Sequence, residues 1–65
     1  MKIERIKVGH TYLAVYRGHE ILVRIDAIVD FHLWCTNIET NKGIALQPEA
    51  VRAGPLTLKP KQHEH

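Results

Sequence analysis

Two β-hairpin patterns fill residues 9–47 and constrain the fold more than any other feature of this 65-residue chain. In each of them, runs of β-branched and aromatic residues flank a short polar segment with one glycine, Gly18 or Gly43. Such runs favour strands, and a glycine at positive φ lets the chain reverse direction. The pattern therefore predicts a small, strongly bent antiparallel sheet.

The strand in the middle of this pattern has the clearest alternation. Apolar side chains occupy the odd positions from residue 21 to 29, and Arg24 and Asp26 lie between them. Pro48 lacks an N–H and ends the fourth strand, and one short 3₁₀ turn is expected between Pro48 and Val51. Residues 1–8 are expected to add a short edge strand or a lead-in. The five expected strands are residues 11–17, 21–29, 33–38, 44–47 and 56–58.

Two registers remain open for the first hairpin. We expect a three-residue loop with Gly18 in the left-handed conformation, whereas a two-residue loop would swap the faces of the first strand. At the second turn Gly43 is expected to be the left-handed residue. In the expected register the core-facing residues are Thr11, Leu13, Val15, Ile21, Val23 and Ile25. The outward residues are then Tyr12, Tyr16 and Arg24.

The size and composition indicate one domain, residues 1–58, followed by a polar tail at residues 59–65 that we expect to be disordered. The 45% apolar content is typical of a globular chain. No apolar run reaches the roughly 18 residues of a membrane span, and the first residues lack the apolar region of a signal peptide. Cys35 is the single cysteine, so no internal disulfide can form, which favours a cytoplasmic protein.

Aromatic and cationic residues are the candidates for a binding surface. Aromatic rings can stack on a base, a peptide or a cation, and arginine and lysine can contact phosphate. The alternative, which we favour, is that the aromatic side chains fill the core or cover its ends and that the cations are solvated, with Arg24 paired across strands to nearby acids. The net charge of +2 is spread along the chain without a basic block. The candidate binding residues are Tyr12, Tyr16, Arg17, Arg24, Trp34, Lys42 and Arg52.

The pattern predicts no catalytic residues, no metal site and no cofactor. Cys35 lies within a strand and is expected to be a buried, inert thiol. The five histidines, among them His63 and His65 of the tail, lack the spacing of a zinc site. Asp26 and Asp30 lack an evident cleft and are expected to be solvated.

The order of these signals resembles the SH3-like small barrels, a superfamily that includes Tudor and KOW modules. The resemblance spans about residues 6–58 and implies a single five-stranded SH3-like antiparallel barrel that acts as a binding module. Such folds host many unrelated functions. The residues that carry it are Gly9, Tyr12, Ala14, Gly18, Val23, Arg24, Ile25, Trp34, Gly43, Pro48 and Val51.

A shorter stretch, from Trp34 to Asn37, is similar to one in the plasmid-borne type II dihydrofolate reductases. Those enzymes are tetramers of SH3-like barrels and use NADPH at a shared pore. Their pore segment, Val-Gln-Ile-Tyr, is missing here, because residues 44–48 read Ile-Ala-Leu-Gln-Pro. An oligomeric enzyme of this kind is therefore the least favoured interpretation.

The expected function is non-catalytic binding or adaptor activity through protein–protein contacts. The partner is a protein or a second copy, met at an exposed strand edge or an aromatic patch. Binding of RNA or DNA through the Tyr, Trp and Arg side chains is the alternative. We expect no membrane and no small-molecule cofactor among the partners.

Overall fold

The structure, a computed structural model, describes residues 1–57 and folds them into strands and short 3₁₀ turns. Five strands form one antiparallel sheet in the order β4-β3-β2-β1-β5, which confirms the predicted all-β class. In this part of the chain no helix is long and apolar enough to cross a membrane. The predicted tail, residues 59–65, lies outside the described residues. In chain order the elements are η1 (Ile3–Arg5), β1 (Thr11–Tyr16), β2 (His19–Val29), β3 (His32–Asn37), β4 (Lys42–Leu46), η2 (Pro48–Ala50) and β5 (Val51–Leu56).

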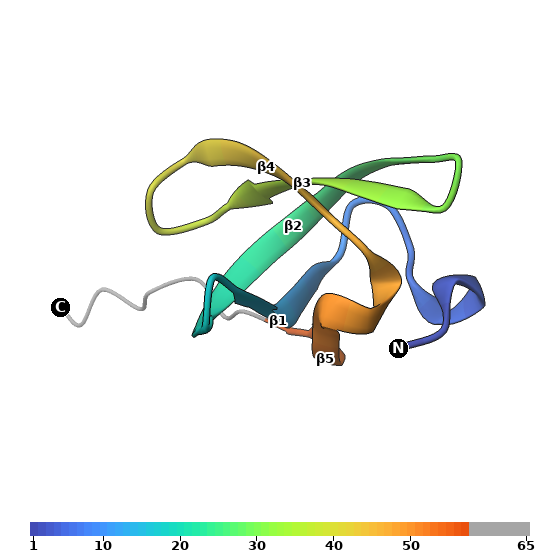
Figure 1. Cartoon of the computed structure of the whole chain (residues 1–65), viewed down its shortest axis with the longest axis horizontal. Helices are drawn as coiled ribbons and strands as arrows, with labels where there is room; N and C mark the ends of the chain where they lie inside the picture. Colours follow the sequence, from blue (N-terminus) through green and yellow to red (C-terminus); the bar gives the residue numbers. More distant parts are fainter. Residues whose placement is uncertain (58–65) are drawn as a thin grey trace, which may run out of the picture.

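The long central strand β2 gives the sheet its bend (Figure 1). Its first half pairs with β1 and its second half with β3, so the two neighbours diverge along it. A register shift between Ile25 and Ala27 places a β-bulge at Asp26, and bulges increase local twist. Within residues 1–57 no pairing joins the edge strands β4 and β5, which η2 connects.

The expected register of the first hairpin is wrong. Tyr16 pairs with His19 across a two-residue turn, in which Arg17 and Gly18 have φ values of 53° and 80°. Turns with two positive φ values match the twist of paired strands, and this preference outweighs the cost of a left-handed arginine. The faces of β1 are therefore inverted. Tyr12 becomes a core residue instead of an outward one.

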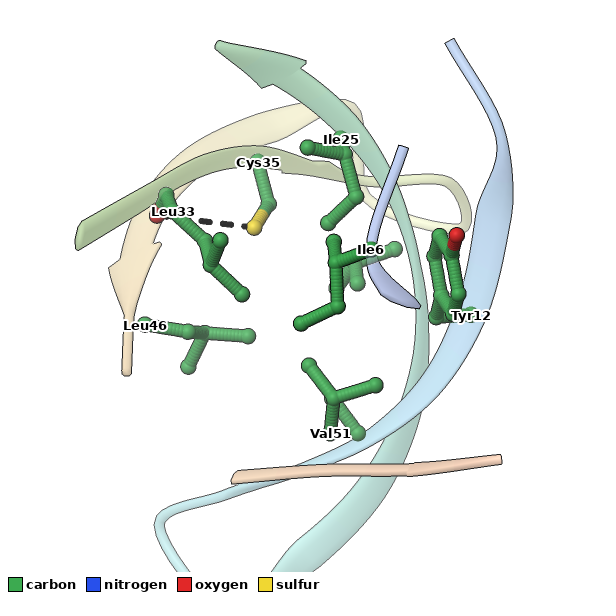
Figure 2. Packing of buried hydrophobic residues seen from close by; sticks show 9 residues of the cluster. Ile6, Tyr12, Ile25, Leu33, Cys35, Leu46 and Val51 are labelled. Atoms are coloured by element: carbon green, nitrogen blue, oxygen red, sulfur yellow. Dashed lines mark hydrogen bonds between the residues drawn. The ribbon is translucent and has the colours of Figure 1, made fainter. Parts of the chain in front are cut away.

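The buried face of the sheet gathers one apolar cluster (Figure 2). Tyr12 is its largest fully buried side chain, and its hydroxyl remains hydrogen-bonded. That hydroxyl accepts the N–H of Lys7 at 2.9 Å and donates to the carbonyl of Arg5 at 3.3 Å. Because these partners precede β1, Tyr12 fastens the N-terminal segment over the sheet. The cluster comprises Ile6, Tyr12, Ala14, Val23, Ile25, Leu33, Cys35, Leu46 and Val51.

The second turn lies at the predicted place, but its left-handed residue is Asn41 and not Gly43. Asn41 has φ 63°, and its N–H donates to the carbonyl of Asn37 at 2.6 Å. The side-chain oxygen of Asn37 accepts the N–H of Glu39 at 2.9 Å. Asparagine tolerates the left-handed region and stabilises turns through its side chain. Gly43 is thereby free to pair with Thr36 inside β4, which begins earlier than expected.

The 3₁₀ turn at Pro48 is confirmed, and the last strand follows it directly instead of beginning at residue 56. Residues 1–8 form η1 and a lead-in, not an edge strand. Gly54 of β5 has φ 138°, and a Cβ built on it would lie 2.5 Å from Cδ2 of Tyr12. Only glycine therefore lets β5 pass this close to the ring of Tyr12.

Replacing Gly54 with alanine is expected to destabilise the fold by about 3 kcal/mol, from backbone strain plus overpacking. Gly9→Ala is the matched control, since Gly9 has φ 90° and a Cβ added to it would meet nothing within 4 Å. Strain alone should cost it about 1 kcal/mol. Urea unfolding gives the free energy of unfolding of both variants. An equal decrease in the two would contradict the close approach of Gly54 to Tyr12.

Candidate functional site

The outer face of the sheet carries a half-exposed tryptophan. Trp34 of β3 is 50% exposed, and its cross-strand neighbours are Ala27 of β2 and Ala45 of β4. Two alanines are too small to cover an indole ring. A depression of about 420 Å³ lies beside it, lined also by Gly43 and Asp26. We call Ala27, Trp34, Gly43 and Ala45 the Trp34 surface.

A hydrogen-bonded trio adjoins the Trp34 surface. Arg24 Nε donates to Asp26 Oδ1 at 3.0 Å, and the hydroxyl of Thr36 donates to Asp26 Oδ2. Together these bonds lower the pKa of Asp26, with the bond from Thr36 as the larger cause. Arg24 is paired with a nearby acid as expected, but Asp26 belongs to the same strand and not to a neighbouring one. The bond uses Nε of a half-exposed guanidinium.

The sequence-predicted candidates do not gather into one patch. Tyr16 is half-buried against the core, and the guanidinium of Arg17 lies 5.4 Å from the centre of its ring. Lys42 and Arg52 belong to β4 and β5, the opposite edges of the sheet. Of the seven candidates, the outer face brings together Trp34 and Arg24. Tyr12 is removed from the surface altogether, with 0% exposure.

A second site, of larger volume, escaped the sequence analysis. A groove of about 840 Å³ runs between the N-terminal segment, the turn that joins β2 to β3, and η2. The amino group of Met1 donates to the carbonyls of Pro48 at 3.1 Å and Val51 at 3.2 Å, which holds two of its walls together. We call it the Phe31 groove. Its lining residues are Met1, Lys2, Ile3, Glu4, Phe31, His32, Gln47, Pro48 and Glu49.

Phe31 stands at the tip of that turn in an unusual conformation. It is 74% exposed and has φ 64°, and the preceding Asp30 has φ 51°. His32 Nδ1 lies 2.9 Å from the carbonyl oxygen of Asp30. The strands expected at residues 21–29 and 33–38 implied a connection here, but not its two-residue length. The sequence feature that could have revealed this site is the pair Asp30-Phe31, because a two-residue turn of this kind ordinarily contains Asn-Gly.

Cys35 is a buried thiol, as the sequence predicted. It is 2% exposed, and its sulfur donates to the carbonyl of Leu33 at 3.5 Å. Desolvation, with a smaller contribution from the charge of Asp26, raises the pKa of Cys35 to about 11. The thiolate needed for nucleophilic attack is therefore scarce at neutral pH.

No three His, Cys, Asp or Glu side chains of residues 1–57 are placed to hold a metal ion. His63 and His65 lie outside the described residues. No family model matches the chain, and it matches neither a curated protein nor a solved structure. The two candidate sites, the Trp34 surface and the Phe31 groove, thus rest on geometry.

Replacing Thr36 with valine should raise the pKa of Asp26 towards its ordinary value of 3.8, because the larger stabilising bond to the carboxylate is lost. Arg24→Gln should raise it less. Carboxyl carbon shifts in an NMR titration measure both values. Thr40→Val, in the exposed turn before β4, is the control and should leave Asp26 unchanged. A larger effect from Arg24 than from Thr36 would contradict this ranking.

Native Cys35 should react with a thiol reagent at neutral pH at least about 100-fold more slowly than in concentrated urea. The rise of its pKa from 9.0 to about 11 alone lowers the thiolate fraction by about that factor. The folded state holds the proton more tightly, so the stability from this group is present below the ordinary pKa and lost as pH rises through about 11. Cys35→Ala should remove this contribution to the loss of stability at alkaline pH. Urea unfolding measured at a series of pH values checks it.

Proposed function

We propose that this chain is a non-catalytic binding module of SH3-like barrel architecture that contacts other proteins. The strand order β4-β3-β2-β1-β5, with a 3₁₀ turn between the two edge strands, supports this architecture. The shared, bent β2 supports it as well, since a barrel needs strands that curl. A role in binding follows from the exposed aromatic residues that this framework positions.

The exposed, strained Phe31 is the observation that carries the proposal. A left-handed conformation costs a residue with a Cβ about 1–2 kcal/mol. At 74% exposure the ring also gains little from burial in the fold. Folding alone gives no reason for phenylalanine here, whereas a ligand in the groove would bury the ring. The inference thus runs from an observed backbone strain at an exposed residue to a functional role for that residue.

The lining of the groove indicates the chemistry of the partner. Its apolar surface comes from Phe31, Ile3 and Pro48, among others. Its charged groups are the carboxylates of Glu4 and Glu49 and two ammonium groups, those of Lys2 and of the Met1 terminus, the latter bonded to backbone carbonyls. An extended segment of a partner protein with apolar side chains complements this lining, and a lysine or arginine in it can pair with Glu4 or Glu49. The volume of about 840 Å³ accommodates a segment of a few residues.

Two other functions stay predictions. Nucleic-acid binding has less support, because Arg24 is paired with Asp26 while Lys42 and Arg52 lie on opposite edge strands. A dense basic surface is the usual mark of that function. A reductase similar to the type II enzymes has no support beyond the four residues 34–37.

Replacing Phe31 with asparagine should abolish binding without weakening the fold. Asparagine tolerates positive φ, so the free energy of unfolding should stay equal or rise by up to about 1 kcal/mol. The probe is a phage-displayed library of random peptides, selected on the wild-type chain and counter-selected on the bare support. Enriched peptides should combine apolar and basic residues and bind the variant at least about tenfold more weakly, as measured by fluorescence anisotropy.

Val8→Asn is the control, since Val8 is 55% exposed and lies outside the groove. It should bind the selected peptides as the wild type does. The double variant Glu4→Gln and Glu49→Gln should weaken the binding of basic peptides, most strongly at low salt. The proposal is wrong if no peptide is enriched on the wild type, or if Phe31→Asn binds the enriched peptides equally well.

A further inference from the structure

The two edges of the sheet differ in how well they are protected against pairing. Strand β5 contains Pro55, which has no N–H to donate, and Gly54, which breaks its regular course. Strand β4 has neither proline nor bulge, and its one charged residue, Lys42, stands at its first position. Within residues 1–57 no strand pairs with the outer edge of β4, which bounds the sheet in Figure 1. An edge without such devices is a template for another strand.

The side chains beside this edge favour close approach of a second strand. On the outer face β4 presents Gly43 and Ala45, and the next side chain inwards is the half-exposed Trp34. The depression of about 420 Å³ lies above these small residues. A strand added to β4 would thus satisfy the backbone groups at its outer edge, and the indole ring could lie over the small outer-face residues of the two strands. Both gains occur at one place.

We propose that β4 pairs with β4 of a second copy, antiparallel and about a two-fold axis at Ile44, and that this pairing covers Trp34 of both copies. In that register Gly43 lies opposite Ala45 of the second copy, so small residues meet and both rings keep their room. Lys42 lies opposite Leu46 of the second copy, so no like charges face each other across the seam. A two-fold contact of this kind closes on itself and stops at the dimer.

Surface area indicates how strong this contact is. A standard interface buries about 800 Å² per partner, roughly a sixth of the 5047 Å² that this chain exposes. A seam of five residues is about 17 Å long. Even with the exposed part of Trp34, this short seam is smaller than a standard interface. We therefore expect a weak dimer whose population depends on concentration.

The pairing is independent of the proposed function, because no residue of β4 and not Trp34 lines the Phe31 groove. The β4 pairing and peptide binding in the groove can therefore be disproved separately. Phe31→Asn should leave the dimer unchanged, and a variant of β4 should leave peptide binding unchanged.

Ala45→Lys tests the seam by placing a charge on the outer face of the edge strand. Sedimentation velocity of the wild type from about 10 μM to about 1 mM should show the mass rise from one copy to two. Over the same range the emission of Trp34, the single tryptophan, should shift to shorter wavelength. Ala45→Lys should dimerise at least about tenfold more weakly. Val8→Lys carries the same added charge at an exposed site off the sheet and should behave as wild type.

Isotope-filtered NOEs in a mixed labelled sample check the register without any substitution. They should connect Gly43 of one copy with Ala45 of the other. A monomeric mass over the whole range would overturn the proposal. So would undiminished dimerisation of a folded Ala45→Lys, or intermolecular NOEs that avoid β4.

Discussion

The buried Tyr12 joins three segments that are far apart in the sequence. Its ring fills the core against β2 and lies under Gly54 of β5, where no other residue would fit. Its hydroxyl bonds the backbone at Arg5 and Lys7. The N-terminal segment is thus held against the sheet, and with it one wall of the Phe31 groove. The Phe31 groove therefore depends on this arrangement.

Three reversals with left-handed residues position these surfaces. Arg17, Asp30, Phe31 and Asn41 all have positive φ although none is glycine. The short turns at its two ends keep β2 paired along its whole length, with β1 on one side and β3 on the other. The strain at Phe31 differs from the others because it displays a large apolar ring. A protein of this size, with a small core, retains such strain only where packing elsewhere compensates.

Strand pattern and turn chemistry predicted the fold better than they predicted the site. The alternation placed Val23 and Ile25 of β2 in the core, but beyond the bulge at Asp26 the faces are exchanged, so that Ile28 packs against the core and Val29 is exposed. Pro48 marked the 3₁₀ turn. Candidates chosen by residue type alone scattered over the molecule. Tyr12 went to the core, and Arg17 and Arg24 acquired intramolecular partners. Phe31 was overlooked because exposure, unlike strand propensity, depends on residues distant in the sequence.

By itself, the sequence determined the all-β class, the number of strands and the inward face of β2 as far as Ile25, because these follow from local periodicity. Only the tertiary structure decided the register of the first hairpin. A slip of one residue inverts every side chain of β1, and local propensity barely distinguishes the two loops. Packing decides between them, since one register buries Tyr12 where the N-terminal segment and Gly54 receive it.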